Sequence, residues 1–489
     1  MELRESAEPV LFATTLEQKP RTPELITDEQ SMGCTPGVLV FNPFAEGYMA
    51  YGRSFTPVKH QALLADDLAN LPQFLCGADD IVLLRRQPSL EFLSSAKRAG
   101  FALPEFIELK TGRIEPGDTL TQRKIGRLRP WAWGPDSVEL LEPLFAKVTG
   151  EARPASQCFN DGIAQLYSKA WSADFLRRIL SGHGAASDPH LQATEPRAKA
   201  ATVDAEPWLC TEQEAGVVVD TLVAALGAIA AIRQRGHHRV VAKEAHGLAG
   251  HNAIRLWEAK LTDPQRQWLA RALQGGRQMV VEPWLERVLD FSIQLEMEPA
   301  GLKLCGYTGL VNDARGQFQA NSAAANDARR IPANVASLFR KPADITSRIQ
   351  RLYSHIFSLL EADLRRVSFL GPVSIDAFVY RKPDGSCRLK PIVELNPRYT
   401  MGRLTVELMK QCCPGSSGLL RLFSRAQARA QGFTDFASYA RSLAERFPLR
   451  LEGEPVPKIR EGAFSLNDPT QAQVCLATFQ VAPPGERLA

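Results

Sequence analysis

The 489-residue sequence lacks the motifs that would assign a class of protein directly. Its nine cysteines contain no CxxC pair and no regular spacing, which argues against a zinc site or a disulfide framework and favours reduced thiols. Neither the GxxxxGK[ST] phosphate loop nor the GxGxxG dinucleotide fingerprint occurs. The net charge is only +4, from 58 basic and 54 acidic residues, so no nucleic-acid or anionic-membrane partner is required.

The sequence also has little that would direct it to a membrane. Its first residues, Met-Glu-Leu-Arg-Glu-Ser, carry charges where a signal peptide needs an apolar core. The most apolar stretch, Ala215 to Ile232, is interrupted by Asp220 and is rich in Ala and Gly, which favours a buried helix over a membrane span. We therefore expect a cytoplasmic protein whose partner is a small molecule.

The composition that is present suits a multidomain globular protein. Hydrophobic residues make up 45% of the chain and charged residues 23%, and the length predicts about three domains. From Pro36 to Leu128, short apolar runs alternate with helical stretches, which predicts an N-terminal parallel α/β domain over 1–130. The next segment, 131–210, has helical spacing and forms a connection. Within it, Ser181 to Pro207 is poor in large apolar residues and is expected to be a flexible insertion.

The segment 211–285 predicts a compact α+β unit. A long helix is expected from Thr211 to Arg233, with Thr211 and Glu214 placed as a capping box. A strand, a glycine loop and a second strand follow, and then a helix from Asp263 to Gln274 and a buried strand.

The remainder predicts a core domain over 286–460 and a weakly patterned C-terminal tail over 461–489. The core contains an expected helix from Ile345 to Val367 and then PVSIDAFVYRKPDGSCRLKPIVELNPRY, the clearest hairpin in the chain. The predicted fold class is therefore a mixed α/β and α+β multidomain protein.

Three polar residues in the hairpin are candidates for a metal site. Glu394 and Asn396 share one face of their strand, and Asp376 joins them if the turn has three residues with Gly385 in the left-handed position. That register makes Asp376 and Glu394 diagonal neighbours about 7 Å apart. Two carboxylates and an amide oxygen are hard ligands that suit Mg²⁺. The alternative is that these carboxylates pair with nearby arginines; their position inside apolar runs favours the metal.

Two further elements are candidates for contacts with phosphate and with adenine. In VVAKEAHGLAGHN, a strand brings Lys243 beside Gly247 and Gly250, where bare backbone and a cation can approach phosphate oxygens. In Glu282-Pro283-Trp284-Leu285, a hinge follows a buried strand and can offer backbone groups to an adenine edge. Trp284 and Leu285 can equally be core residues.

Taken in order, these elements resemble the ATP-grasp superfamily of carboxylate-amine and carboxylate-thiol ligases, from about Tyr167 to Gly402. Asp376 with Glu394-Leu395-Asn396-Pro397-Arg398 is similar to the metal-binding hairpin of that family. The resemblance implies a particular set of site residues. These are Asp376, Glu394 and Asn396 for Mg²⁺; Arg398 and Lys243 for catalysis at the phosphates; Lys169 and Lys243, with Gly247 and Gly250, for binding ATP; Glu282, Trp284 and Leu285 for adenine; and Asp290, or alternatively Glu286, for ribose.

The function implied by the resemblance is ATP-dependent ligation. A carboxylic acid, such as an amino acid or another small acid, would be activated as an acyl phosphate and joined to an amine, which forms a C–N bond and releases ADP and phosphate. The alternatives are ligation to a thiol, or an ATP-binding regulatory or interaction protein on the same scaffold; a homodimer is left open. The loop HGLAGHN departs from the family in having fewer glycines.

Overall fold

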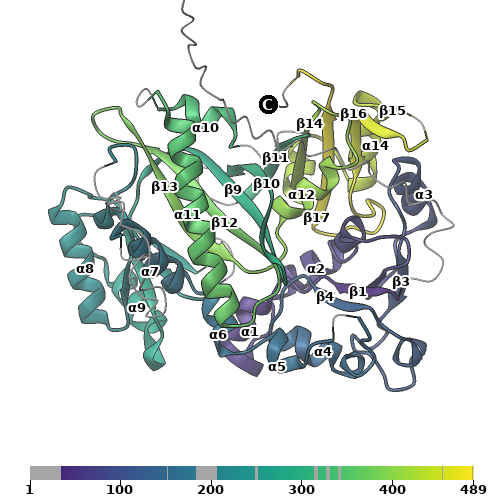
Figure 1. Ribbon diagram of the computed structural model, residues 1–489, viewed down its shortest axis with the longest axis horizontal. Coiled ribbons are helices and arrows are strands. Elements are labelled where there is room, and N and C mark those ends of the chain that lie inside the picture. Colours follow the sequence, from purple (N-terminus) through teal and green to yellow (C-terminus); the bar gives the residue numbers. More distant parts are fainter. Residues whose placement is uncertain are drawn as a thin grey trace, which may run out of the picture. The chain divides into compact units, whose positions relative to one another are not determined.

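The computed structural model describes residues 35–150, 152–182, 206–247, 252–312, 318–325, 331–339, 343–453, 455–486 and 488. Most of the predicted insertion, residues 183–205, lies outside the described residues, as does Gly250 of the predicted phosphate loop. Within the described ranges the strands form a parallel sheet and two antiparallel sheets (Figure 1).

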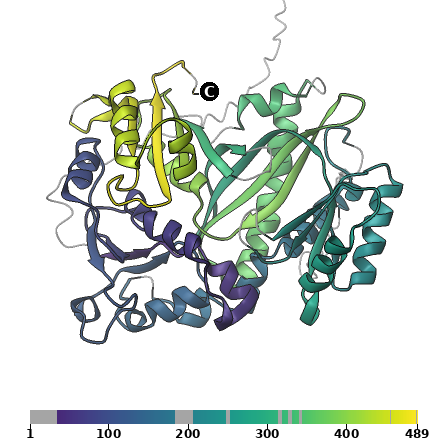
Figure 2. The same ribbon diagram turned by 180° about the vertical axis from the view of Figure 1, so that it is seen from behind.

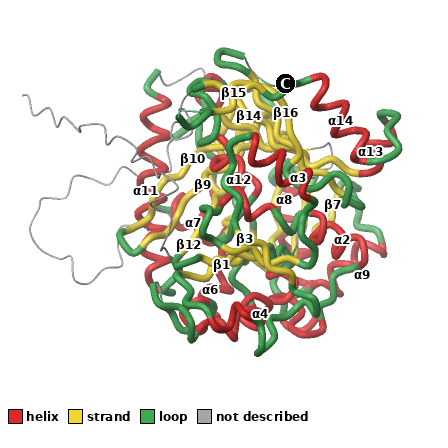
Figure 3. The backbone as a smooth tube through the Cα atoms, turned by 90° about the vertical axis from the view of Figure 1, so that its right-hand side faces the viewer, coloured by secondary structure: helices red, strands yellow, loops and turns green. Residues whose placement is uncertain are grey.

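The N-terminal region contains a parallel sheet with strand order β3-β2-β1-β4. Its strands are β1 (Gly37–Val40), β2 (Ile81–Leu84), β3 (Glu105–Glu108) and β4 (Arg127–Pro130). Its helices are α1 (Ala45–Tyr51), α2 (Lys59–Asp67), α3 (Leu90–Arg98) and α4 (Pro135–Phe145). The central strands, GVLV and IVLL, are buried along their whole length because apolar groups cover both faces, and α4 packs beneath the sheet (Figure 3). This confirms the predicted parallel α/β arrangement of this region.

The connection that follows is helical, as predicted, and leads into a second sheet. Its helices are α5 (Ala155–Cys158), α6 (Asp161–Leu166) and α7 (Lys169–Leu180). The second sheet has strand order β5-β8-β6-β7 and is antiparallel. We call this sheet and its helices the lid; its elements are β5 (Val217–Val219), α8 (Leu222–Gln234), β6 (Val240–Glu244), β7 (Ala253–Leu256), α9 (Asp263–Ala272) and β8 (Met279–Pro283).

The start of the lid differs from the predicted long helix. Thr211 and Glu214 form the expected capping box, but it caps only a single 3₁₀ turn. The β-branched run Val217–Val219 then pairs with β8 as a strand, and the helix begins after Thr221, whose side chain accepts a hydrogen bond from the Ala224 amide. Three consecutive valines favour a strand wherever a partner strand is present.

The third sheet has nine strands in the order β13-β12-β9-β10-β11-β14-β17-β16-β15. They are β9 (Glu286–Glu298), β10 (Gly301–Asn312), β11 (Phe318–Ala324), β12 (Gly371–Arg381), β13 (Cys387–Asn396), β14 (Ser417–Ser424), β15 (Arg450–Glu452), β16 (Lys458–Ser465) and β17 (Cys475–Ala482). The accompanying helices are α10 (Ala333–Ser337), α11 (Ile345–Arg366), α12 (Met401–Met409), α13 (Arg425–Ala430) and α14 (Phe436–Arg446). Figure 2 shows the same elements from behind.

The largest apolar core lies between α11, α7 and one face of this sheet. The helix α11 has the predicted extent and buries a stripe at helical spacing that includes Ile349, Ile356 and Leu360. The stripe packs against β9 and β12, and this packing holds the strands of the predicted metal-binding hairpin in place (Figure 1).

The C-terminal residues form strands instead of the expected tail. β17 lies between β14 and β16 in the nine-stranded sheet, and it is buried along almost its full length. The carboxylate of Asp67, at the end of α2, accepts hydrogen bonds from the backbone amides of Gln473, Val474 and Cys475 at 2.7–3.0 Å. The C-terminal segment is therefore tied to the N-terminal domain.

Among the described residues, no helix combines the length and the apolar character that crossing a membrane requires.

Candidate active site

The hairpin between β12 and β13 places Asp376 and Glu394 directly opposite each other. The turn has the predicted form: the Lys382 amide donates to the Ser386 carbonyl at 2.8 Å, and Gly385 has a φ of 81°. A three-residue turn alone would pair Asp376 with Ile392, which is the diagonal arrangement expected from the sequence. The diagonal arrangement was therefore wrong: Asp376 pairs directly with Glu394.

A bulge in β13 causes the difference. Phe378 pairs with Lys390 and Asp376 pairs with Glu394, so Ala377 faces three residues, Pro391 to Val393. Two extra residues leave the alternation of faces unchanged, and both carboxylates therefore still point to the same side of the sheet. The bulge brings them closer than the diagonal register would.

The two carboxylates lie in unequal surroundings. Asp376 accepts a hydrogen bond at 3.1 Å from the Asn396 side-chain amide. Desolvation, together with the negative charge of Glu394, raises the pKa of Asp376 to about 6. No ion pair to Asp376 occurs in the part of the chain that the structure describes. Asp376 is thus a desolvated carboxyl group that has no paired cation among the described residues.

Glu394 already has a cation beside it. Lys169 Nζ lies 2.8 Å from Glu394 Oε1 and donates to the Gly247 carbonyl at 3.1 Å. Burial opposes ionisation of Glu394, but Lys169 holds the pKa of its carboxyl below the usual value. The helix α7 positions Lys169 in its first turn, and Ser172 of the same helix accepts a hydrogen bond at 3.0 Å from the Leu395 amide.

A second group of charges joins the lid to the core sheet. The side chain of Glu282 on β8 forms ion pairs with Lys243 on β6 and, at 2.7 Å, with Lys390 on β13. Burial alone would raise the pKa of Glu282, but the two ammonium groups hold it well below its usual range. These three residues line the same narrow cleft as Lys169 and Glu394.

Arg398 lies at the far end of the hairpin. Its guanidinium group donates to Asn396 Oδ1 at 3.0 Å and forms an ion pair at 2.9 Å with Glu46 of α1. Burial opposes the charge on Arg398, but Glu46 and Glu394 raise its pKa, so the arginine stays cationic. The predicted metal ligands, both predicted lysines and Arg398 are therefore brought together around β12 and β13.

The predicted adenine hinge comprises the last two residues of β8 and the two residues after it, and its side chains contact other parts of the protein. Leu285 is buried in the main core. The ring of Trp284 stacks with the guanidinium groups of Arg255 and Arg287, at 5.1 Å and 5.9 Å from its centre. Asp290 forms an ion pair with Arg287 at 2.9 Å, and Glu286 is exposed at the start of β9.

The sequence reasoning missed Lys390 and Glu46, both of which contact predicted site residues. Lys390 interrupts a buried apolar run, as Glu394 does, and that signal could have identified it. Glu46 is one of many acids near a helix start, and nothing in the sequence distinguishes it.

The residues around Asp376 fit a divalent cation. In the described ranges, no group of three or more His, Cys, Asp or Glu side chains is placed to hold a metal. The candidate set instead has two carboxylates and the amide of Asn396, which are oxygen donors of the kind that Mg²⁺ takes when phosphates and water supply its other ligands. The raised pKa of Asp376 agrees with a position that a cation would occupy.

Comparisons with known proteins find likeness in structure. No family model matches the sequence, and no curated protein matches it. N5-carboxyaminoimidazole synthetase from Staphylococcus aureus complexed with ADP aligns with a TM-score of 0.45 and 10% identity, over 93% of this chain and 94% of that chain. Biotin carboxylase from Campylobacter jejuni aligns with a TM-score of 0.44 and 10% identity, over 92% and 88%.

A carboxyaminoimidazole ribonucleotide synthase from Aspergillus clavatus complexed with ATP aligns with a TM-score of 0.41 and 12% identity, over 83% of this chain and 94% of that chain. The likeness to all three is one of fold.

Proposed function

We propose that this protein is an ATP-dependent ligase of the ATP-grasp type, which activates a carboxylic acid as an acyl phosphate and joins it to an amine. The observation that carries the proposal is the convergence on one hairpin of Asp376, Glu394 and Asn396 with Lys169 and Arg398. Oxygen ligands for a cation beside fixed positive groups are what phosphoryl transfer needs.

Asp376, Glu394 and Asn396 would hold Mg²⁺. When bound, the metal would supply positive charge to the phosphate oxygens of ATP and so favour transfer of the terminal phosphoryl group. The Asn396 amide already links the metal side of the hairpin to Arg398, because it donates to Asp376 and accepts from Arg398. One residue thus fixes the orientation of both.

Three cations would bind the phosphates. Lys169 and Lys243 now pair with Glu394 and Glu282, and Arg398 pairs with Glu46. The phosphates of ATP would compete with these carboxylates for the same ammonium and guanidinium groups. The ion pairs hold the cations in position before ATP arrives, which lowers the cost of ordering them on binding.

The chemistry follows from charge and position. An oxygen of the substrate carboxylate attacks the γ-phosphorus of ATP, the bond to the β-phosphate oxygen breaks, and ADP leaves. The amine then attacks the acyl carbon, the phosphate leaves, and the amine loses a proton to form the amide. Lys243 and Arg398 would offset the negative charge that develops on the transferred group.

The test is release of ADP and phosphate by the purified full-length protein with Mg²⁺ and pools of small acids and amines, with products identified by mass. We expect ADP and phosphate in equal amounts with an amide product. Release of AMP and pyrophosphate would contradict the acyl-phosphate route, and binding of ATP without turnover in any pool would favour a regulatory protein.

Replacement of Glu394 by Gln tests the site itself. Glu394→Gln keeps the shape but removes a negative oxygen ligand, and we expect turnover to fall at least about 100-fold. The matched control is Glu445→Gln, at an exposed glutamate of α14, which should leave turnover unchanged. Full activity of Glu394→Gln would rule out the proposed metal ligand.

A further inference from the structure

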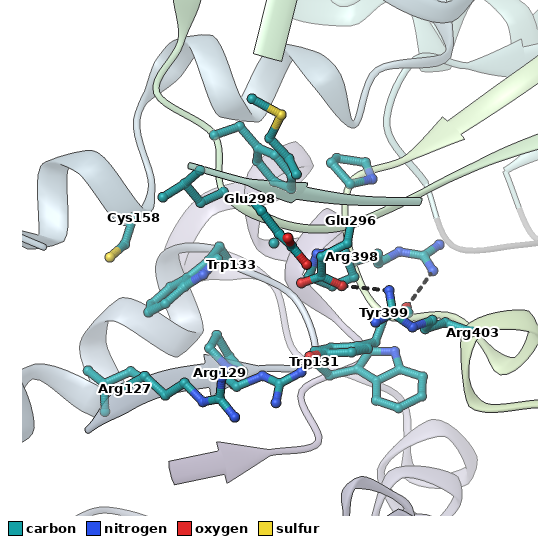
Figure 4. A pocket seen from close by; sticks show the side chains of 18 of the residues that line it. Arg127, Arg129, Trp131, Trp133, Cys158, Glu296, Glu298, Arg398, Tyr399 and Arg403 are labelled. Carbon is teal, nitrogen blue, oxygen red and sulfur yellow. Dashed lines mark hydrogen bonds and ion pairs between the residues drawn. The ribbon is translucent and has the colours of Figure 1, made fainter. Parts of the chain in front are cut away.

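A second cavity, of about 480 Å³, lies between the N-terminal domain and the core sheet (Figure 4). Its walls come from β4 and the residues after it, the adjoining ends of β9 and β10, the start of β12, and α12 with the segment before it. Arg398 lines this cavity and also donates to Asn396 of the metal hairpin. The cavity therefore adjoins the proposed phosphoryl-transfer site.

The lining carries an excess of positive charge. Seven basic side chains, Arg127, Arg129, Arg153, Lys303, Arg398, Arg403 and Lys410, face three acidic ones, Glu296, Glu298 and Glu407. Each of the acids is already paired with a cation of the lining: Arg403 lies 2.5 Å from Glu296 and 2.9 Å from Glu407, and Lys303 lies 3.2 Å from Glu298. Arg398 pairs with Glu46, which does not line the cavity, and Arg127, Arg129 and Arg153 form no ion pair among the described residues.

Two of those arginines stand together on one strand. Arg127 and Arg129 are two residues apart on the edge strand β4, so their side chains share a face, and Figure 4 shows them along the same wall. Among the described residues, neither forms an ion pair. The Arg129 guanidinium donates to the Tyr399 hydroxyl and lies 5.5 Å from the centre of its ring. Tyr399 holds Arg129 in place without neutralising it.

The cavity also has a rigid aromatic part. Trp131 and Trp133 follow β4 and are both buried. Trp131 packs against Phe41 and Tyr399, with ring centres 4.8 Å and 5.7 Å apart. A site with a fixed aromatic wall and unpaired guanidinium groups is suited to a small organic anion, because the planar guanidinium binds carboxylate and phosphate oxygens in pairs.

From this arrangement we propose that the cavity holds the substrate acid, and that Arg129 and Arg127 bind a second anionic group, a carboxylate or a phosphate, remote from the reacting carboxylate. The reacting end would lie at Arg398, where the cavity meets the metal hairpin. This inference rests on the proposed ligase function for the role of the ligand, and on the charge of the cavity for its class.

The test compares three compounds that share one short chain and differ at the far end: propanoate, succinate and 3-phosphonopropanoate. Binding to the full-length protein is measured by titration calorimetry without nucleotide. We expect succinate or 3-phosphonopropanoate to bind at least 10-fold more tightly than propanoate, and the tighter of the two identifies the second group as carboxylate or phosphate. Equal binding of all three compounds, or no binding, would overturn the inference.

Variants then locate the second group. Arg129→Met should remove the 10-fold preference, and Arg129→Lys should retain part of it because the charge remains. Arg113→Met is the matched control, since Arg113 belongs to the same domain, is exposed and does not line the cavity. Arg127→Met is a second probe should Arg129→Met fail to fold, which circular dichroism would detect. A preference retained in both methionine variants would overturn the assignment.

A separate titration with ADP and Mg²⁺ keeps this inference distinct from the proposed function. If the protein prefers the dianionic compounds but does not bind ADP, the ligase proposal fails and the anion site stands. If it binds ADP but shows no preference among the three compounds, the anion site fails and the ligase proposal stands.

Discussion

Asp376 shows at the scale of one residue how a site can be built at the expense of stability. Its carboxyl is desolvated and faces Glu394, and its pKa rises to about 6 from an ordinary value of 3.8. Because the folded pKa is the higher one, the folded state disfavours the charged carboxylate. The resulting cost is absent below about pH 4, grows between pH 4 and 6, and is complete above pH 6.

Asp376→Asn should therefore stabilise the metal-free protein at pH 7.5. A shift of this size corresponds to a gain on the order of 3 kcal/mol in the free energy of unfolding, and the gain should be small near pH 4. Urea unfolding at the two pH values, without divalent ions, measures it. The variant should also lose ligase turnover. A lower stability than wild type at pH 7.5 would mean that Asp376 stabilises the fold.

Among single residues, the sequence indicated which polar side chains meet on the hairpin but not all the contacts that they make. Asp376, Glu394 and Asn396 could be selected because each polar group interrupts or ends an apolar strand. The partner of Arg398 could not be predicted, since Glu46 lies 352 positions away and its helix is short. An ion pair of this kind depends on how α1 is placed against the hairpin, which no local pattern records.

At the scale of elements, the buried charges of Glu282, Lys243 and Lys390 connect the lid sheet to the core sheet. Glu282 is 7% exposed and Lys390 is 2% exposed, so the Lys390 ammonium group cannot turn to water if the carboxylate is removed. Breaking a buried pair in this way leaves an uncompensated charge, which is more costly than losing a surface pair.

Glu282→Gln should lower the free energy of unfolding by about 3 kcal/mol at neutral pH. The pKa of Glu282 is lowered in the fold, so its contribution is present above about pH 4.5 and is lost as the pH falls through the folded pKa. Chemical unfolding from pH 7.5 downward measures this. Glu286→Gln, at an exposed position on β9, is the control and should change stability by less than about 0.5 kcal/mol. Equal effects of the two variants would contradict a role for the buried network.

Helices, strands and turns were predictable where a local sequence pattern specifies them. They were missed where pairing with a distant strand determines the structure. The hairpin turn followed from Pro383-Asp384-Gly385, and α11 followed from its apolar stripe. The bulge at Pro391 to Val393 left no sequence signal that could be separated from an ordinary buried run. Val217–Val219 falls within the expected helix because its strand character depends on β8, which lies about 60 residues further on.

At the scale of the whole described molecule, contacts between distant segments set how the site is enclosed. Asp67 accepts hydrogen bonds from the amides at and just before the start of β17, more than 400 positions away, and this contact joins the weakly patterned C-terminal segment to α2. A second long-range contact connects the N-terminal domain to the lid. Tyr51, the last residue of α1, donates to Glu244 of β6 at 3.0 Å, and Arg277 of the lid lies 5.6 Å from the centre of its ring.

The Tyr51 contact should restrain the lid, because it holds Glu244 at the end of β6. This strand carries Lys243 and leads directly to the loop that contains Gly247. Tyr51→Phe removes the hydrogen bond and keeps the ring beneath Arg277. One exposed hydrogen bond contributes about 1 kcal/mol, so amides of β6 and β7 should exchange with solvent about 5-fold faster in the variant, while global stability changes little.

Tyr48→Phe in the same helix is the matched control, since its hydroxyl makes no described hydrogen bond to the lid. Hydrogen exchange read by mass spectrometry separates the outcomes. Unchanged exchange in β6 and β7 would show that the Tyr51 hydrogen bond does not restrain the lid, and equal acceleration in α1 would indicate a local loosening of the helix.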